Sequence, residues 1–427
     1  MTEKILAISI LILVYVLILS KRVHRTTAVL LGAILVVGLR ILDEHEVLDA
    51  IQWEALGLIF GMFVIVAALT RSGFFRWVGL HALKFSHFQP FRILLAFSVL
   101  SALLAAFMDS ITVMVFMASL TVEVCGTLKL HPAPFLIAEI TSANIGGVST
   151  MVGDPPNIIL GTSLGFTFTD FVANTGIIAV VVFIVNLGVL SYLLKRRGKS
   201  LMRVDADLLE KEHAELDPAS AIVDMRLMRV SLIIFTFTVT LLILHRLLDL
   251  LIAFVAVLGA TLVLILGGKD MPELVEKIDW HTLLFLGGLF VVVGGLDKSG
   301  ALADVASGMA AFGGHNLALL LTTLLWVSTL MSMFLDNVPF AAAMVPVLRN
   351  LAADGVAPLA PMTWSVALAA DIGGNATPIG ASANVVGLAI AEKHGTHIGW
   401  REYMRFALPA MLLSMLAANI LLLMFYH

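Results

Sequence analysis

Four short polar segments, arranged as two pairs, carry the residue types that could do chemistry in this chain. Two of them read Met-Asp-Ser-Ile-Thr at 108–112 and Leu-Asp-Asn-Val-Pro at 335–339. The other two, at 144–157 and 371–384, combine a Gly-Gly pair with acids, amides, hydroxyls and prolines. Oxygen-rich groups of this kind can hold a sodium ion, and neighbouring acids can share a proton. The candidate site residues that bind substrate or ion are Asp109, Ser110, Asn144, Gly146, Gly147, Thr150, Asp154, Asn157, Asp336, Asn337, Asp371, Asn375, Thr377, Ser382 and Asn384.

The segments are paired because the chain is duplicated. The offset of 227 residues that separates Trp53 from Trp280 also relates Asp109 to Asp336. A long duplication whose shared residues are Gly, Pro, Asp and Asn is typical of transporters that build a binding site at mid-membrane from two related halves. We therefore expect a first repeat at 1–194, a cytoplasmic linker at 195–230 and a second repeat at 231–427.

The composition indicates an all-α polytopic membrane protein. Of the 427 residues, 60% are apolar and 13% are charged, against about half and about a quarter in a soluble domain. A helix needs about 20 apolar residues to cross a bilayer, and tilt accommodates shorter windows. The first window is expected to be a retained span and not a signal peptide, because no small-residue cleavage pattern follows it. The long, nearly uncharged windows are Ile5–Leu19, Thr26–Leu39, Leu56–Leu69, Thr175–Leu194, Ser231–Leu244 and Leu250–Leu266.

Charge placement predicts the orientation. If the basic cluster at 21–25 is cytoplasmic, all but five of the 26 Lys and Arg fall on the cytoplasmic side, as the positive-inside rule requires. Both termini are then external. Each half is expected to cross the membrane five times, and an odd number inverts the second repeat relative to the first. The expected architecture has about ten transmembrane helices and two broken helices, with re-entrant hairpins at Arg92–Leu128 and Asn316–Leu351 and an interfacial helix at Phe74–Phe88.

The breaks have a physical reason to line a polar cavity. Prolines remove backbone donors and glycines lower helix stability, so the chain cannot stay helical from Gly146 to Pro155. Unpaired backbone in hydrocarbon is costly unless it faces such a cavity. The alternative is that Asp109 or Ser110 merely caps the second hairpin arm and that the glycines serve close packing. Acids within the membrane are expensive and usually functional, which favours a binding role.

The acids are not symmetric between the repeats. Asp154 corresponds to Ala381, and Asp371 corresponds to Asn144. Glu139 is a further acid with an apolar counterpart, so it is either a proton relay or a snorkelling side chain. The expected grouping is one site per repeat, the first with Asp109, Asn144, Asp154 and Asn157 and the second with Asp336, Asp371, Asn375 and Asn384.

The remaining composition narrows the function. No Lys or Arg lies in the four segments, which argues against a multiply charged organic anion and favours a neutral solute or a small cation. The single Cys125 excludes an intrachain disulfide and a thiolate-cluster metal site. The net charge of −4 does not suggest nucleic acid. Because hydrolase motifs such as His-Glu-x-x-His and Gly-x-Ser-x-Gly are absent, no enzymatic activity is expected.

The motifs resemble those of the ion-transporter superfamily. The resemblance rests on the two hairpin-tip motifs, on Ile-Ala-Glu-Ile at 137–140, on Gly-Asp-Pro-Pro-Asn at 153–157 and on Gly-Asn-Ala-Thr-Pro-Ile-Gly-Ala-Ser-Ala-Asn at 374–384. It spans nearly the whole chain and is closest to the group of arsenite permeases, NhaD-type sodium/proton antiporters and the pink-eyed-dilution protein. The resemblance implies an elevator-capable inverted-repeat fold with the substrate between hairpin tips and breaks. The more distant citrate and dicarboxylate carriers show Ser-Asn-Thr at the tips, so a carboxylate substrate is not expected.

Two substrate hypotheses follow. The first is efflux of arsenite or antimonite driven by inward protons, because arsenous acid is a neutral trihydroxy molecule that Asn, Ser and Thr could hold. The second is sodium/proton antiport through the same acids, and a passive channel is a further alternative. The proton or sodium is expected as coupling ion, without any cofactor or metal. We expect a bacterial or archaeal inner membrane, a small inorganic solute, and as partners a second copy of the chain or, for an arsenite pump, a soluble ATPase subunit.

Overall fold

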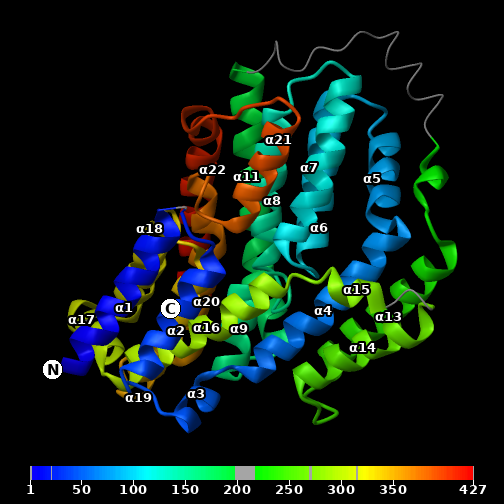
Figure 1. Ribbon diagram of the computed structural model, residues 1–427. Helices are drawn as coiled ribbons and strands as arrows, with labels where there is room; N and C mark the ends of the chain where they lie inside the picture. Colours follow the sequence, from blue (N-terminus) through cyan, green and yellow to red (C-terminus); the bar gives the residue numbers. More distant parts are fainter. Residues whose placement is uncertain (1, 21, 198–216, 269–271, 314–315, 427) are drawn as a thin grey trace.

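The protein is a helical bundle with no strand among the residues that the computed structural model describes, which are 2–20, 22–197, 217–268, 272–313 and 316–426 (Figure 1). Within the described part, six helical segments are long and apolar enough to cross a bilayer, and five shorter apolar helices accompany them. The fold is therefore that of an all-helical polytopic membrane protein. The six long segments are Trp53–Ser72, Ser110–Thr127, Phe168–Arg196, Met225–Leu244, Trp280–Lys298 and Trp400–Tyr426.

The first copy of the duplication runs to the end of α11. Its elements are α1 Thr2–Leu19, α2 Arg25–Gly38, α3 Glu44–Ala50, α4 Trp53–Ser72, α5 Phe74–Phe85, α6 Pro90–Ala105, α7 Ser110–Thr127, α8 Ala133–Gly147, α9 Pro155–Leu164, α10 Phe168–Phe171, the π-helical turn η1 Val172–Gly176 and α11 Ile177–Arg197.

The second copy repeats this order after the linker. Most of the predicted linker, including the acidic and basic run at 205–212, lies outside the described residues. The elements are η2 Pro218–Ala221, α13 Met225–Leu244, α14 Ile252–Leu266, α15 Pro272–Glu276, α16 Trp280–Lys298, α17 Ala301–Gly313, α18 Leu317–Ser332, α19 Asn337–Ala353, α20 Leu359–Gly373, η3 Gly374–Ala376, α21 Ser382–Lys393 and α22 Trp400–Tyr426.

The structure reproduces the sequence offset element by element. Helices α4, α6, α7 and α9 begin 227 residues before α16, α18, α19 and α21 respectively. Local contacts are repeated as well. The indole of Trp53 donates to the Leu48 carbonyl at 3.1 Å, and the indole of Trp280 donates to the Val275 carbonyl at 2.9 Å. The two copies therefore share one local fold from α1 to α11 and from α13 to α22.

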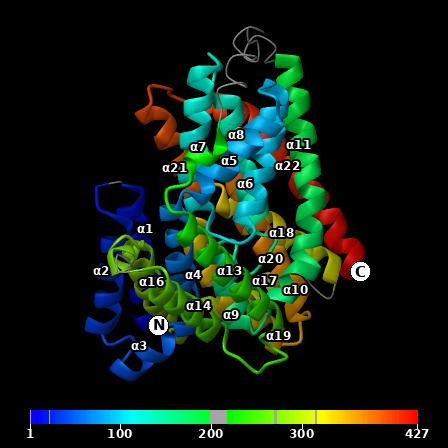
Figure 2. The same cartoon turned by 90° about the vertical axis from the view of Figure 1, so that its right-hand side faces the viewer.

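The two copies pack reciprocally. Helix α2 packs on α16 while its counterpart α14 packs on α4, and α7 packs on α21 while α19 packs on α9. Exchange of partners in both directions is the mark of a two-fold relation. The equivalent helices α11 and α22 lie side by side, and Tyr426 at the end of α22 contacts Asn174 just before α11. These two helices are therefore antiparallel, and Figures 1 and 2 place α5, α6 and α7 at the opposite end of the molecule from α17 and α19.

The hairpins and breaks lie where the sequence predicted them. The first hairpin turns between α6 and α7 and the second between α18 and α19. Helix α8 ends at Gly147 and α9 begins at Pro155, and the second break separates α20 from α21. The helix expected at Phe74–Phe88 ends at Phe85, because His87 and Phe88 adopt left-handed backbone conformations. The number of crossings, the re-entrant nature of the hairpins and the interfacial position of α5 stay predictions.

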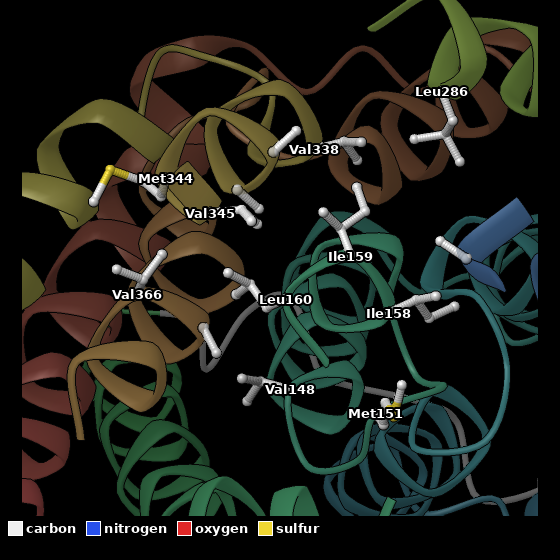
Figure 3. Packing of buried hydrophobic residues seen from close by; sticks show 14 of the residues in the cluster. Val148, Met151, Ile158, Ile159, Leu160, Leu286, Val338, Met344, Val345 and Val366 are labelled. Carbon is white, nitrogen blue, oxygen red and sulfur yellow. The ribbon is translucent and has the colours of Figure 1, made fainter. Parts of the chain in front are cut away.

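The apolar core surrounds the breaks. Ile159 and Leu160 of α9 are buried, and Figure 3 shows Leu160 beside Val345 and Val366 of α19 and α20. Every residue of α8 is buried, as is every residue of α20 from Pro361 to Gly373. The half-helices that lead into the two breaks therefore run through the centre of the molecule.

Close packing of α4 on α14 gives the first testable expectation. A Cβ atom at Gly61 would lie 2.4 Å from the carbonyl carbon of Ala256, whereas one at Gly287 of α16 would meet nothing within 4 Å. We expect Gly61→Leu to lower the stability by about 1–3 kcal/mol because α4 and α14 are forced apart. Gly287→Leu is the matched control and should unfold at the parent temperature. Thermal unfolding of the detergent-solubilised protein measures both, and equal melting of the two variants would contradict this packing.

Candidate functional site

One asparagine side chain forms hydrogen bonds across each break in the chain. The amide nitrogen of Asn157 donates to the Gly147 carbonyl at 3.0 Å and to the Thr150 carbonyl at 3.3 Å. In the second copy Asn384 donates to the equivalent carbonyls of residues 374 and 377, each at 2.8 Å. These carbonyls have lost their helical partners, and a buried polar group without a partner is costly. Asn157 and Asn384 therefore hold the two breaks open in the apolar interior.

The breaks are also fixed against the hairpins. A Cβ atom at Gly146 would lie 2.1 Å from the Ala102 carbonyl oxygen, and one at Gly373 would lie 2.9 Å from the Thr329 Cα. Ala102 and Thr329 are themselves related by the repeat offset, so α6 and α18 approach the break helices in the same way. The hydroxyl of Thr377 donates to the Met333 carbonyl at 2.5 Å. Close packing is thus one role of Gly146, as the structural alternative proposed.

The tip acids cap the second arms of the hairpins. Asp109 accepts a hydrogen bond from the backbone of Thr112 at 3.2 Å, and Asp336 accepts one from Val338 at 3.3 Å. Capping of this kind satisfies the free N–H groups at a helix start. The capping interpretation is confirmed for Asp109, and Asp336 caps its own helix in the same way while having a further partner described below.

Acids from both halves meet in one cluster. Asp154 accepts from the Ser110 hydroxyl at 2.7 Å. The amide nitrogen of Asn337 donates to Asp154 and to Asp371, each at 3.1 Å. Asn157 also donates to Asp371 at 3.1 Å. All five side chains are buried. This acidic cluster combines residues 110, 154 and 157 of the first repeat with 337 and 371 of the second.

The amides of the breaks form a second cluster. Asn144 donates to Asn375 at 2.7 Å and to Asn384 at 2.8 Å, and Asn375 donates to the Thr141 carbonyl at 3.3 Å. The repeat offset relates Asn144 to Asp371 and Asn384 to Asn157. The contact between Asn144 and Asn384 is therefore the counterpart of the contact between Asp371 and Asn157, but it joins two amides where the other joins an acid and an amide. The expected grouping into one site per repeat is therefore wrong: each cluster draws on both repeats, and Asp154 and Asp371 lie together.

A guanidinium enters the site from outside the four segments. Arg25 at the start of α2 donates to Ser382 at 2.9 Å and to Asp336 at 3.3 Å, and its second nitrogen donates to Thr282 at 3.3 Å. The guanidinium carbon of Arg25 lies 5.3 Å from the centre of the Phe285 ring. The sequence placed Arg25 in a cytoplasmic basic cluster. The four segments themselves hold no Lys or Arg, but the folded site contains this cation, so their composition does not by itself exclude an anionic solute.

A small cavity joins these groups. Its volume is about 20 Å³, roughly the space of one water molecule. A solute larger than water would therefore require the surrounding side chains to move. The cavity is lined by Arg25, Ser110, Ile111, Asp154, Pro155, Thr282, Phe285, Asn337, Val338, Ala381 and Ser382.

Two larger cavities flank the site and are related by the repeat. One, of about 440 Å³, is lined by Asp109, Arg71, Lys277 and Asp279 on α4, α7 and the segment before α16. The other, of about 160 Å³, is lined by α16, α19 and the segment before α4, including Arg349. Each copy thus contributes equivalent walls to a cavity, and Asp109 lines the first of them.

Glu139 lies apart from both clusters. It is fully buried on α8 and accepts from the Thr121 hydroxyl at 2.5 Å, while its second oxygen has no hydrogen-bond partner. Snorkelling is therefore wrong for this residue, and its role as a proton relay stays a prediction. Within the described residues, no group of three or more His, Cys, Asp or Glu could hold a metal ion.

Comparison with known proteins gives a family. The model of the citrate transporter (CitMHS) family matches residues 15–369. A 46 kDa membrane protein of Mycobacterium leprae is 36% identical over 98% of both chains. The P protein of Mus musculus is 30% identical over 96% of this chain and 58% of its own length.

Two solved structures share the fold. The YdaH transporter of Alcanivorax borkumensis superposes with a TM-score of 0.60 at 13% identity, over 90% of this chain and 89% of the other. MtrF of Neisseria gonorrhoeae, described with a class of antimetabolite efflux pumps, gives a TM-score of 0.57 at 12% identity, over 86% and 80%. At these identities the likeness concerns the fold alone.

Asn157 and Asn384, the two asparagines that bridge the breaks, provide a matched pair of variants. Asn157→Ala and Asn384→Ala each leave two break carbonyls without a donor, so both should lose about 1–3 kcal/mol of stability. Only Asn157 also contacts a carboxylate. We therefore expect Asn157→Ala, and not Asn384→Ala, to change how the unfolding temperature depends on pH. Thermal unfolding at several pH values tests this, and an identical pH profile for both variants would contradict the assignment of Asn157 to the acidic cluster.

Proposed function

The chain belongs to the citrate transporter family within the ion-transporter superfamily, and we propose that it is a proton-coupled secondary active transporter that exports arsenite or antimonite. It is a multi-pass membrane transporter and not an enzyme. The family description names citrate, whereas the solute proposed for this chain follows from its site.

The observation that carries the proposal is the shared amide of Asn337 between Asp154 and Asp371. Two carboxylates held on one donor repel each other in an interior of low polarity, and a single proton relieves that repulsion. Asp154 comes from the break of the first repeat and Asp371 from that of the second. Binding of a proton there is therefore sensitive to how the two halves are placed, which is what coupling to transport requires.

The groups around the small cavity suit a small neutral oxyacid. Ser110 and Asn337 supply a hydroxyl and an amide, Arg25 supplies donors, and Asp154 supplies an acceptor. Arsenous acid presents three hydroxyls, each of which both donates and accepts. Because the site holds no thiol, binding would not need thiol chemistry; Cys125 is buried on α7.

The same proposal includes the membrane topology. We infer an inverted repeat of about ten spans with two re-entrant hairpins, supported by the antiparallel α11 and α22 and by the reciprocal packing of the copies. The two flanking cavities would be entrances from opposite sides. The coupling acids belong to the chain itself, so the proposed activity needs no ATPase subunit. A homodimer in a bacterial inner membrane completes the proposal.

Sodium/proton antiport is the second candidate. Carboxylate and amide oxygens are ligands that a sodium ion accepts. In the acidic cluster the Oδ1 atom of Asn157 is buried without a hydrogen-bond partner. An unsatisfied acceptor beside Asp371 is the specific observation that favours a cation there.

Arsenite transport can be tested in everted vesicles energised with a proton gradient. The parent should accumulate arsenite, and Asp154→Asn and Asp371→Asn should each lower the proton-driven rate by about tenfold or more, because each removes one member of the acid pair. Asp304→Asn is the control, since that acid makes only a surface pair with Lys4 of little energetic weight. Accumulation no better than in empty vesicles would end the arsenite proposal.

The sodium alternative has a separate readout. If the acidic cluster exchanges sodium for protons, added sodium should collapse a preformed pH gradient in proteoliposomes, and Asp154→Asn should abolish that collapse. Under the arsenite proposal, sodium leaves the gradient intact and arsenite dissipates it. A fluorescent pH dye inside the vesicles records both experiments with the same preparation.

A further inference from the structure

Arg25 is a cation that lines the small cavity of the candidate site. Its side chain is 27% exposed, and it lines that cavity together with Thr282 and Ser382. A charged side chain within a bilayer is costly and is retained where it serves a function. The position has no equivalent in the other copy, where the offset leads to Ile252. The repeat architecture therefore does not itself require this guanidinium.

The partners of Arg25 hold it loosely. Its contacts to Asp336 and Thr282 are both 3.3 Å, longer than the roughly 2.7–2.9 Å that is typical of charge-assisted hydrogen bonds. Only the contact to Ser382, at 2.9 Å, falls in that range. The guanidinium has five N–H donors in a planar fork, and it suits oxygens presented side by side. Its present partners are thus open to exchange for the oxygens of a solute.

Asp336 is the carboxylate that pairs with Arg25 in this structure. It is the tip acid of the second hairpin, and it accepts hydrogen bonds from Arg25 and, at 3.4 Å, from the hydroxyl of Ser382. The three groups come from α2, from the hairpin tip and from the start of α21. A solute whose oxygens bind Arg25 therefore competes with this internal carboxylate for the guanidinium.

We propose that Arg25 binds the transported solute directly by donating hydrogen bonds to its oxygen atoms, so that the substrate class is a small oxyacid and not a bare metal cation. The proposal rests on the proposed function, since it takes the small cavity as the transport site. An oxyacid gains the donors of Arg25 when it displaces Asp336. A sodium ion gains nothing from them, because a fixed positive charge repels it.

Binding to the purified full-length protein tests the assignment without requiring transport. The probes are arsenite and boric acid, which are neutral trihydroxy acids at neutral pH, formate as a monoanion, and sodium. Each is titrated against the thermal unfolding temperature, which rises with ligand occupancy. The variants are Arg25→Gln, Arg25→Lys and Asp336→Asn, and Arg401→Gln on the exposed start of α22 is the matched control.

We expect at least one oxyacid to stabilise the parent and Arg401→Gln equally. Arg25→Gln should weaken its apparent affinity by about tenfold, equivalent to ~1.4 kcal/mol. Arg25→Lys should recover part of the loss, because it restores the charge without the fork. Asp336→Asn should bind the oxyacid more tightly than the parent, since the internal competitor is gone. A purely structural ion pair would not produce that gain. If Arg25→Gln does not fold, Arg25→Lys and Asp336→Asn still test the assignment.

The outcomes separate this inference from the proposed function. An oxyacid affinity in Arg25→Gln within about twofold of the parent, or stabilisation of the parent by sodium and by none of the oxyacids, overturns the role of Arg25. If proton-driven arsenite uptake persists in Arg25→Gln with an unchanged KM, the proposed function stands and this inference fails. If Arg25→Gln loses oxyacid affinity while Asp154→Asn keeps proton coupling, the inference stands and the proposed coupling pair fails.

Discussion

The structure depends on how backbone groups freed by two helix breaks find partners inside an apolar bundle. Between Gly147 and Pro155, and again between the equivalent helices of the second copy, carbonyls and N–H groups lose their helical hydrogen bonds. Water cannot reach them at membrane depth, so protein groups must satisfy them. Asn157 and Asn384 do so from the next half-helix. Because polar side chains are already required at the centre of the bundle, a polar binding site there needs little additional free energy.

Duplication places two such breaks against each other, and substitution then makes them different. Asn384 faces Asn144 through amides alone, whereas its counterpart Asn157 faces the carboxylate of Asp371. The second acid, Asp154, stands where the other copy has Ala381. Both changes add charge to the same cluster. One of the two symmetric positions therefore carries acids, while the other is a neutral amide network that joins the two halves.

Residue identity and spacing determined much of this in advance. The offset between Trp53 and Trp280 predicted equivalent elements throughout both copies. The Gly-Gly and Pro-Pro positions predicted where α8 ends and where α9 begins, because local backbone chemistry decides where a helix stops and starts. The acids at the hairpin tips were identified from their type alone, since carboxylates are rare in apolar segments. The lengths of helices were harder to predict. Helix α5 ends at Phe85 because His87 adopts a left-handed backbone conformation, and hydrophobic periodicity does not encode such a conformation.

Only the tertiary structure decided which of these residues meet. Asp154 and Asp371 were assigned to separate sites, and the fold instead joins them through Asn337. Arg25 lies 311 positions from Asp336 and was counted with a cytoplasmic basic cluster, yet α2 carries it to the second hairpin. The physical reason is the same in both cases. Local propensities fix where elements begin and end, but partners across the repeat are chosen by the reciprocal packing of α2 on α16 and of α7 on α21, which no single segment encodes.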